Sequence, residues 1–373
     1  MIHPTPGQLQ TIAALRAQLH AIPELSMQEY RTMAHIQSFL HIHTSCTVHE
    51  EDGWLWAEHH VSDTAPTVVF RADTDAIPCA ATGQPFHGCG HDGHAAAVAG
   101  LAYLLETAPP DKNVIFLFQP GEETGEGAKR CCALFSRIHA DAIYGCHTIP
   151  GYPLGHVLWR EDAFACASRG MILHFHGQQC HAAYPETGRN PAQAAAAVVG
   201  ALDGFLHEDN TAYRGMVLAT VVGLQIGGRR FGVSAGDGEL CLTVRAHFED
   251  DLEALIARIT DFAVRTGQAH GITVTHEFLD VFPDTINDAQ TAAAFRTQME
   301  THGIPLLPLA EPMRWSEDFG HYCRHTRGVF FGIGAGEDSP ALHTDDFCFN
   351  DALLARILEV YLAILEPPHT NNA

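Results

Sequence analysis

The chain has 373 residues, of which 46% are hydrophobic and 17% are charged. A single hydrophobic core stops growing near ~250–300 residues, so we expect two domains of a soluble globular protein rather than a disordered chain. The 21 Lys and Arg residues against 44 Asp and Glu residues give a formal net charge of −23. Such an acidic surface repels phosphate backbones, which argues against nucleic acid as a partner.

The sequence also gives expectations about location. No apolar run approaches the ~20 residues that a membrane span needs, so we expect no membrane partner. The first twenty residues lack a basic head followed by an apolar core, which predicts that there is no signal peptide. The eleven cysteines are an odd number, and Cys131 and Cys132 are neighbours, which suits reduced thiols in a cytoplasmic protein.

The first part of the chain alternates between helical and strand patterns. Residues 8–41 have apolar residues at helical spacing on both sides of a break at 20–24. A further helix is predicted over 92–106, with Asp92 as its N-cap. Short apolar runs predict buried strands at 67–71, 114–118 and 141–146. This alternation predicts an α/β fold with a mostly parallel sheet and flanking helices.

The pattern changes after about residue 166. Three runs predict strands, at 170–177, 216–226 and 239–248. Two helices and a last strand accompany them: an Ala-rich helix opened by Asn190-Pro191, a helix over 251–269 and a strand over 272–279. The order β-α-β-β-α-β is typical of a small self-contained α+β unit. We therefore expect residues 166–279 to form a domain inserted into a larger one, made of residues 1–165 and 280–373, that closes with a helix capped by Asn350.

Three predicted strands of the larger domain run into possible metal ligands. The first is followed by Asp73 and Asp75, the second by Glu122 and Glu123, and the third by His147. Sites of open α/β sheets lie beyond the carboxyl ends of the strands, so these side chains should share one edge. Each set also has a structural explanation that involves no metal. The aspartates could form a turn, the glutamates could belong to a solvated acidic loop, and the histidine could be an ordinary buried one among 26.

The segment 87–94 reads His-Gly-Cys-Gly-His-Asp-Gly-His and precedes the predicted helix. Cys89 and His91 offer a thiolate and an imidazole, and the glycines allow the loop to fold tightly around an ion. A cysteine nucleophile with a histidine base is the rival interpretation. The nearby carboxylates favour metal binding, because Glu122 and Glu123 can divide two tasks. One can bind metal, while the other takes a proton from an activated water.

These motifs resemble the metal-dependent amidohydrolases of the aminoacylase and carboxypeptidase G-type metallopeptidase superfamily. That group includes hippurate hydrolase, N-acetyldiaminopimelate deacetylase and plant auxin–amino acid conjugate hydrolases. The matching blocks follow the family's order and span nearly the whole chain, at 20–25, 70–78, 87–94, 119–123, 145–147, 181–185, 316–319 and 342–343.

The resemblance implies a zinc-peptidase-like catalytic domain, with the inserted domain as a lid, and two divalent metal ions per subunit. The ligands it implies are Cys89, His91, Glu123, His147 and His343. The resemblance implies Mn²⁺ or Zn²⁺ as the metal, and Ni²⁺ or Co²⁺ would also suit this donor set.

The resemblance also implies the catalytic groups. Glu122 would be the general base, and Asp75 would support the site with Asp73 close by, near the substrate. His181 of the lid would bind substrate and stabilise the oxyanion, either within its own subunit or from the partner subunit of a homodimer. The lid's edge strand would pair two subunits.

The function implied is hydrolysis of the amide bond of an N-acyl amino acid or a similar small conjugate. Two alternatives remain: a dipeptidase or carboxypeptidase with the same site, and a non-catalytic metal- or ligand-binding protein on the same scaffold. The chain departs from the family where an Asn-Val-Ile-Pro segment is usual, since residues 230–236 read Arg-Phe-Gly-Val-Ser-Ala-Gly. This change bears on substrate specificity rather than on the hydrolytic chemistry.

Overall fold

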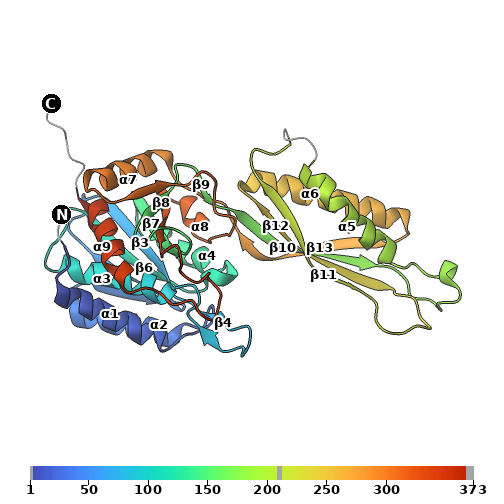
Figure 1. Cartoon of the computed structure of the whole chain (residues 1–373), viewed down its shortest axis with the longest axis horizontal. Helices are drawn as coiled ribbons and strands as arrows, with labels where there is room; N and C mark the ends of the chain where they lie inside the picture. The colour runs from blue at the N-terminus through green and yellow to red at the C-terminus, as the bar shows by residue number, and fades with distance from the viewer. Residues whose placement is uncertain (1–2, 208–211, 367–373) are drawn as a thin grey trace. The chain divides into compact units, whose positions relative to one another are not determined.

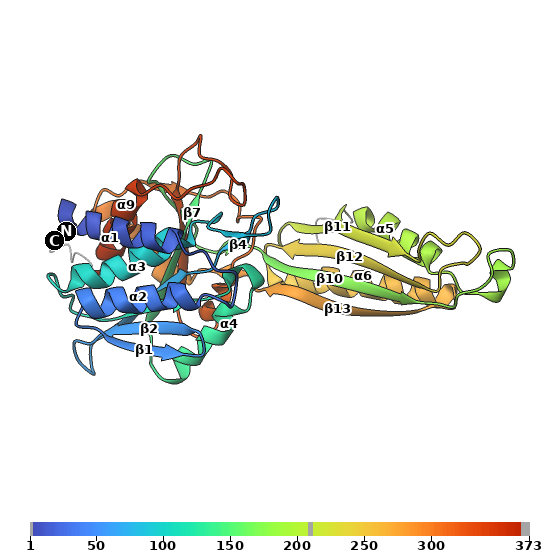
Figure 2. The same ribbon diagram turned by 90° about the horizontal axis from the view of Figure 1, so that it is seen from below.

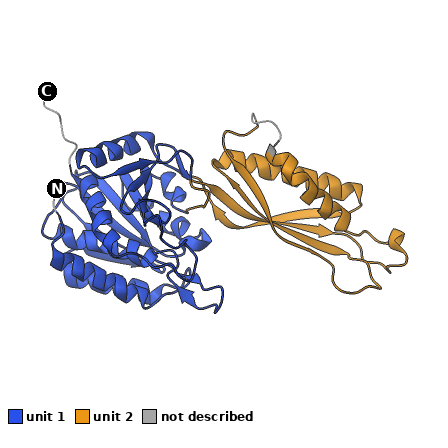
Figure 3. Cartoon of the chain, viewed as in Figure 1, with its two compact units in different colours: residues 1–164, 285–312, 318–373 blue, residues 165–284, 313–317 orange. Residues whose placement is uncertain are grey.

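The computed structural model describes residues 3–207 and 212–366, which fall into two compact units (Figure 3). Unit 1 comprises Met1–Phe164, Thr285–Pro312 and Asp318–Ala373, and unit 2 comprises Ala165–Asp284 and Met313–Glu317. The chain therefore passes between the units after residues 164, 284, 312 and 317.

Unit 1 is built on an eight-stranded sheet with the order β1-β2-β6-β3-β7-β16-β8-β15. Figure 1 labels β3, β6 and β7 of this sheet. Its strands are β1 (Thr47–Glu51), β2 (Trp54–His59), β3 (Thr67–Asp73), β6 (Asn113–Gln119), β7 (Ala142–Ile149), β8 (Val157–Trp159), β15 (Leu306–Pro308) and β16 (Gly328–Gly334). The central strands β6, β3, β7 and β16 run parallel, whereas the β1–β2 hairpin joins β6 antiparallel. The prediction of a mostly parallel α/β sheet is confirmed.

Helices pack on this sheet. They are α1 (Pro6–His20), α2 (Tyr30–His43), α3 (His91–Leu105), α4 (Gly127–Cys131), α7 (Ala289–Thr301), α8 (Gly320–Cys323) and α9 (Ala352–Leu365). Short strands complete the unit: β4 (Ile77–Pro78), β5 (Pro85–Phe86), β9 (Ala163–Ala165) and β14 (Thr285–Ile286), of which β9 reaches the first residue of unit 2. Helix α3 is buried along almost its whole length, and its small residues allow α1 and α9 to approach it closely. At Gly100, for example, a Cβ atom would come within 2.7 Å of Ile12.

The predicted N-cap of α3 is wrong. The helix begins at His91, and the residue before it is Gly90, whose φ of +88° suits glycine. Asp92 lies inside the first turn, and its carboxylate bonds to His20 Nδ1 at 2.7 Å and lies 3.6 Å from Arg16 Nη1. The Asp92 carboxylate, which was expected to cap α3, therefore interacts with His20 and Arg16 of α1 instead.

Unit 2 is an antiparallel sheet covered by two helices (Figure 2). The strand order is β11-β12-β10-β13, with β10 (Ala167–His176), β11 (Val217–Ile226), β12 (Asp237–Ala246) and β13 (Thr273–Phe282), and the helices are α5 (Ala192–His207) and α6 (Glu249–Ala269). The predicted inner face of β12 is buried, as Leu240, Leu242, Val244 and Ala246 show. Ala192 N donates to Asn190 Oδ1 at 3.0 Å, the expected cap of α5.

Candidate metal centre

The carboxyl ends of three neighbouring strands meet at one edge of the unit 1 sheet. Strand β3 lies between β6 and β7, and all three run parallel. Asp73 ends β3, whereas β6 leads into a single 3-10 turn, Glu122–Thr124. His147 lies within β7 rather than after it, because the strand continues to Ile149 beside β16. This corrects the strand end expected at residue 146.

The predicted ligands cluster around Cys89. Its Sγ lies 3.2 Å from His147 Nε2 and 3.4 Å from His343 Nε2. His343 Nε2 in turn lies 3.3 Å from Glu123 Oε1. The donor atoms of Cys89, His91 and His147 all lie within 4.8 Å of one another, and so do those of Cys89, Glu123 and His343. Cys89 thus belongs to two overlapping three-residue groups.

Two loops are held together to form this cluster. His343 comes from the loop after β16 and has a φ of +63°, an uncommon conformation for a residue other than glycine. Its backbone N–H donates to Gly88 O at 2.9 Å. Gly88 itself has no room for a side chain, since a Cβ atom would approach Phe86 to 2.5 Å. This bond places the His343 loop directly against the Cys89 loop.

Asp75 orients two of the groups around the cluster. Its Oδ1 is 3.0 Å from His91 Nδ1, and its Oδ2 accepts from Glu123 N at 3.0 Å and from Ser26 Oγ at 2.7 Å. Burial alone would raise the pKa of Asp75, but its hydrogen bonds and the charge of His91 hold the pKa below its ordinary value. An ionised Asp75 engages His91 Nδ1, which leaves Nε2 as the ring nitrogen that would bind an ion, after the ring has lost its extra proton.

Asp73 is fully buried and has protein partners for both oxygens. Oδ1 is 2.8 Å from His94 Nδ1, and Oδ2 accepts from Arg71 Nη1 at 2.9 Å. Arg71 also donates to Asp318 Oδ1 at 2.9 Å and to Gln119 Oε1 at 2.7 Å. Despite burial, the charges of His91, His94 and Arg71 hold the pKa of Asp73 well below its ordinary range. Any influence of Asp73 on a substrate would therefore pass through its neighbours.

The residues present fit a cation. His91 Nε2 and Glu123 Oε1 are buried and make no well-aligned hydrogen bond with the described residues, although His343 Nε2 lies 3.3 Å from Glu123 Oε1. A buried imidazole nitrogen and a buried carboxylate oxygen without such bonds are costly, and a divalent ion satisfies both. Burial, with His94 nearby, lowers the pKa of His147 well below its usual range, so its ring stays neutral. Burial and Glu123 raise the pKa of the Cys89 thiol, which an ion would deprotonate on binding.

Glu122 stands next to this donor set. It begins the 3-10 turn after β6, has 6% of its surface exposed, and groups with His91 and Glu123 within 4.8 Å. The preceding residue, Gly121, has a φ of +61°, and a Cβ atom there would lie 2.3 Å from Met27 Sδ. The turn therefore depends on glycine to present Glu122 and Glu123 in succession.

His181 belongs to unit 2, where it pairs through its backbone with Val233. Ala183 N donates to its Nδ1 at 3.1 Å, which leaves Nε2 as the protonated ring nitrogen and a hydrogen-bond donor. Beside it lies a hollow of about 630 Å³, lined by residues that include Arg230, Ser234 and Asp237. The segment 230–236, where the chain departs from the family, thus adjoins His181. The role of His181 stays a prediction.

Sequence reasoning missed residues that support the site. Ser26 and Glu29 follow the matching block 20–25, and each binds a group next to the cluster. Arg71 and Asp318 lie inside matching blocks, yet nothing in their spacing indicated that they form a buried pair. Their partners are remote in sequence or are backbone N–H groups, so only the folded chain reveals them.

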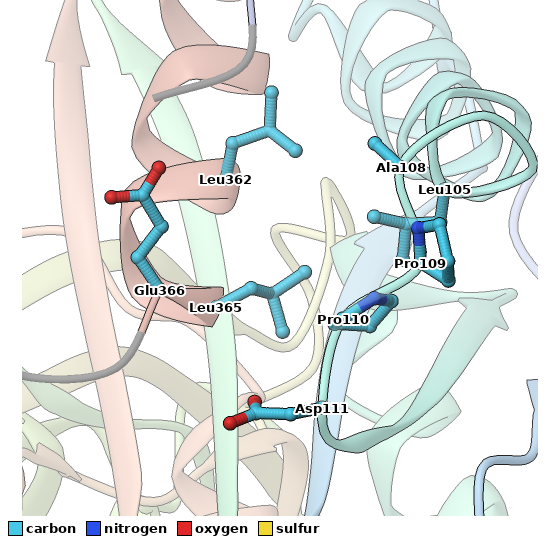
Figure 4. Close-up of a pocket in the computed structure, with 8 residues that line it drawn as sticks. All are labelled: Leu105, Ala108, Pro109, Pro110, Asp111, Leu362, Leu365 and Glu366. Carbon is cyan, nitrogen blue, oxygen red and sulfur yellow. The ribbon is translucent and has the colours of Figure 1, made fainter.

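Other features of unit 1 lie apart from the cluster. A hollow of about 290 Å³ lies between the C-terminal ends of α3 and α9, lined mainly by leucine, alanine and proline side chains (Figure 4). It contains no thiol or imidazole among its lining residues, so it offers no comparable chemistry. Among the residues that the structure describes, no helix combines the length and apolarity required to cross a membrane.

The profile of peptidase family M20/M25/M40 matches residues 69–366. The chain belongs to this family. The match spans all of unit 2 and most of unit 1, and its range includes every predicted metal ligand. It confirms the predicted family relationship and the predicted enzyme class, a hydrolase of amide bonds.

Individual relatives extend over nearly the whole chain. The N-acetyldiaminopimelate deacetylase of Leuconostoc mesenteroides is 29% identical over 371 residues, covering 94% of this chain and 95% of the relative. The protein of the same name from Exiguobacterium sibiricum is 28% identical over 344 residues, covering 88% and 91%.

Solved structures share the fold. An aminohydrolase from methicillin-resistant Staphylococcus aureus superposes with a TM-score of 0.87 at 21% identity, covering 96% of this chain and 97% of that one. A dinuclear metal-binding peptidase of family M20 from Bacillus subtilis gives a TM-score of 0.81 at 22% identity, covering 97% and 99%. At these identities the likeness establishes the fold and nothing finer.

Proposed function

We propose that the chain removes the acyl group from N-acylated amino acids at a centre of two divalent ions. N-acetyldiaminopimelate is the first substrate to test, because several relatives at 26–29% identity carry the name N-acetyldiaminopimelate deacetylase. The observation that carries the proposal is the pair of overlapping donor groups around Cys89, with the carboxylate of Glu122 beside them.

Two ions would divide the donors between them. His91 and His147 with Cys89 suit one position, and Glu123 and His343 with Cys89 suit the other. A thiolate, neutral imidazoles and a carboxylate are compatible with Zn²⁺, Mn²⁺, Co²⁺ or Ni²⁺. The buried thiolate gives Zn²⁺ the strongest support from the donor chemistry alone, whereas Mn²⁺ is supported by the family resemblance.

When bound, the ions would polarise the amide carbonyl and make an attacking water more acidic. Glu122 would accept the proton of that water as the oxygen attacks the carbonyl carbon. Its carboxylic acid would then protonate the amine nitrogen as the C–N bond breaks. The products are a carboxylic acid and a free amine, and Glu122 returns to its ionised form.

Asp75 would keep His91 and Glu123 in position throughout this cycle. His181 would donate a hydrogen bond from Nε2 to the developing oxyanion, a task that its Nδ1 contact with Ala183 N favours. Arg230 would bind the carboxylate of the amino acid part, since a guanidinium forms paired hydrogen bonds with carboxylates. It would take over the task of the asparagine that the family pattern has on this segment.

We also propose a homodimer formed through the edge of the unit 2 sheet. Strand β11 lies at this edge, and its Val222 and Leu224 are 63% and 50% exposed. An edge strand with exposed apolar side chains favours pairing with a second strand. Light scattering of wild-type protein and of Val222→Lys would test it, with a monomeric variant as the expected result.

The test of the activity is a comparison of substrate classes. Protein stripped of metal and reloaded with Zn²⁺ or Mn²⁺ is incubated with N-acetyldiaminopimelate, N-acetyl and N-benzoyl amino acids, and unmodified dipeptides. We expect release of amine from the acylated compounds in preference to dipeptides. Turnover restricted to dipeptides would establish the peptidase alternative, and fully loaded protein without any turnover would favour a binding protein.

A further inference from the structure

A second group of metal-binding side chains lies at the edge of the unit 1 sheet. Cys46 immediately precedes β1, His59 ends β2, and Glu106 follows the last residue of α3. One donor atom from each lies within 4.8 Å of the other two. The antiparallel register pairs Thr47 with Glu58, so the next position outward places Cys46 opposite His59.

The Glu106 carboxylate is held in place by the neighbouring loop. Its Oε1 accepts hydrogen bonds from Ser45 N at 2.8 Å and from Ser45 Oγ at 2.9 Å. Cys46 N is bonded to Thr44 Oγ1 at 3.3 Å, so the residue that carries the thiol is also fixed. Supporting bonds that orient the first ligands are a regular feature of built metal sites. Cys46 and His59 are partly buried, whereas Glu106 is exposed, which leaves a path for an ion to enter.

The position is separate from the catalytic centre. His91 begins α3, and Glu106 follows its end, so the two lie about 22 Å apart along the helix axis, at a rise of about 1.5 Å per residue. The two groups share no residue. Binding at one can therefore be measured without disturbing the ligands of the other.

We propose that Cys46, His59 and Glu106 bind one divalent ion of the zinc type, with water as a fourth ligand. Thiolate, imidazole and carboxylate are the three donor types that Zn²⁺ takes from proteins. The ion would tie the loop before β1 to the end of β2 and to the end of α3, three segments that are distant in sequence.

Burial raises the pKa of the Cys46 thiol, and the charge of Glu106 adds to this effect, whereas the hydrogen bond with Thr44 opposes it. The thiol is therefore protonated in the ion-free protein at neutral pH, and binding must release its proton.

Metal counting on the full chain tests the proposal. Wild-type protein and the variants Cys46→Ala and His59→Ala are stripped, reloaded with Zn²⁺, freed of excess ion and analysed for zinc per chain. Each variant should hold one equivalent less than wild type. His60→Ala, next to His59 and half-exposed, and Cys241→Ala, in unit 2, are the matched controls and should hold as much zinc as wild type. Equal zinc content in wild type, Cys46→Ala and His59→Ala would overturn the proposal.

A spectroscopic test separates this ion from the catalytic pair. Cys89→Ser protein loaded with Co²⁺ should keep a near-ultraviolet thiolate-to-cobalt absorption band, and the double variant Cys89→Ser/Cys46→Ser should lose it. No such band in Cys89→Ser would refute the site, even if Cys46→Ala failed to fold. The outcome does not depend on activity, so a failure of the proposed function would leave it unaffected.

Discussion

Glu29 accepts a hydrogen bond from Gly121 N at 2.7 Å, and it does so from a buried position at the start of α2. The same oxygen, Oε1, also accepts from Met27 N at 3.0 Å. Gly121 immediately precedes Glu122, so a residue almost a hundred positions away holds the turn that carries the proposed base. The bond links the N-terminal helices of the chain to the catalytic chemistry.

We expect Glu29→Ala to lower kcat by about ten- to a hundredfold, because a displaced turn would misplace Glu122 relative to the substrate. KM should change little. The same turn carries Glu123, so some loss of metal is expected, and kcat is therefore compared at saturating metal. Glu29→Gln keeps an acceptor oxygen at the same place and should restore most of kcat. Steady-state kinetics of the three proteins, with metal analysis, provide the measurement. Equal activity of the alanine and glutamine variants would contradict the positioning role.

Glu29 also predicts a pH dependence of stability in the metal-free protein. Burial, and secondarily the charge of Asp75, raise the pKa of Glu29 to about 7 from 4.5. The folded state thus holds a proton that the unfolded state loses, so this group's contribution falls as pH rises from about 4.5 to about 7. Glu29→Gln should therefore gain about 2 kcal/mol in free energy of unfolding, relative to wild type, between pH 5 and pH 8. Denaturant titrations of stripped proteins would measure this, and a pH-independent difference would contradict it.

Replacing the proposed base should separate catalysis from metal binding. Glu122→Gln should lower kcat by about 10²–10⁴-fold, the usual effect of losing a general base. Metal content should remain that of wild type, because Cys89, His91, Glu123, His147 and His343 are untouched. Glu126→Gln, a nearby glutamate outside the cluster, is the control and should be fully active. Wild-type activity in Glu122→Gln would assign the proton transfer to another residue.

Removal of metal should abolish activity and loosen the site. Chelator-treated protein should show no measurable turnover and should recover it with Zn²⁺ or Mn²⁺. Cys89→Ser should bind the ions more weakly, because it removes the donor common to both groups. Metal titrations followed by the midpoint of thermal unfolding would measure both effects. Undiminished activity of protein shown to be free of metal would exclude a metal-dependent mechanism.

Arg230 provides a test of specificity. Arg230→Ala should raise KM about ten- to a hundredfold for acyl amino acids with a free carboxylate, the cost of losing a charged hydrogen bond. The same substrates with an amidated carboxylate should show little change between the two proteins. Arg229→Ala, at the neighbouring position, serves as the control. A drop in kcat for both substrate types would instead indicate that the segment acts on the position of His181.

The α/β fold could be predicted because periodicity reports burial. Strands β3, β6 and β7 are buried along almost their whole length, and each contains an apolar run that can be recognised in the sequence. The buried residues of α6 recur at helical spacing. The hairpin β1–β2 gave no such signal at β1, a half-exposed edge strand with the sequence Thr-Val-His-Glu-Glu. An edge strand buries too little to leave a clear pattern.

The candidate metal ligands could be identified from motifs, because each sits in a short block with its own chemistry. The support around them could not. Asp92 had the sequence context of an N-cap, but a partner 72 residues away, His20, binds its carboxylate instead. Glu29 accepts a hydrogen bond from a backbone N–H. Every non-proline residue carries such a group, so the sequence does not show which one is bound. Short sequence motifs predict the candidate ligands, whereas hydrogen bonds between residues distant in the sequence determine their orientation.

The return of residues 313–317 to unit 2 has a consequence for engineering. Cys166 N donates to Met313 O at 3.2 Å and to Trp315 O at 3.0 Å, and Arg245 Nη1 donates to Ser316 Oγ at 2.8 Å. Joining residue 164 directly to residue 285 would delete Cys166 and Arg245, which bind residues 313–317. The residue after this segment, Asp318, accepts a hydrogen bond from Arg71. Residues 313–317 would then be an internal loop without its partners, next to the buried pair of Arg71 and Asp318, so a shortened version of the chain must redesign this loop as well.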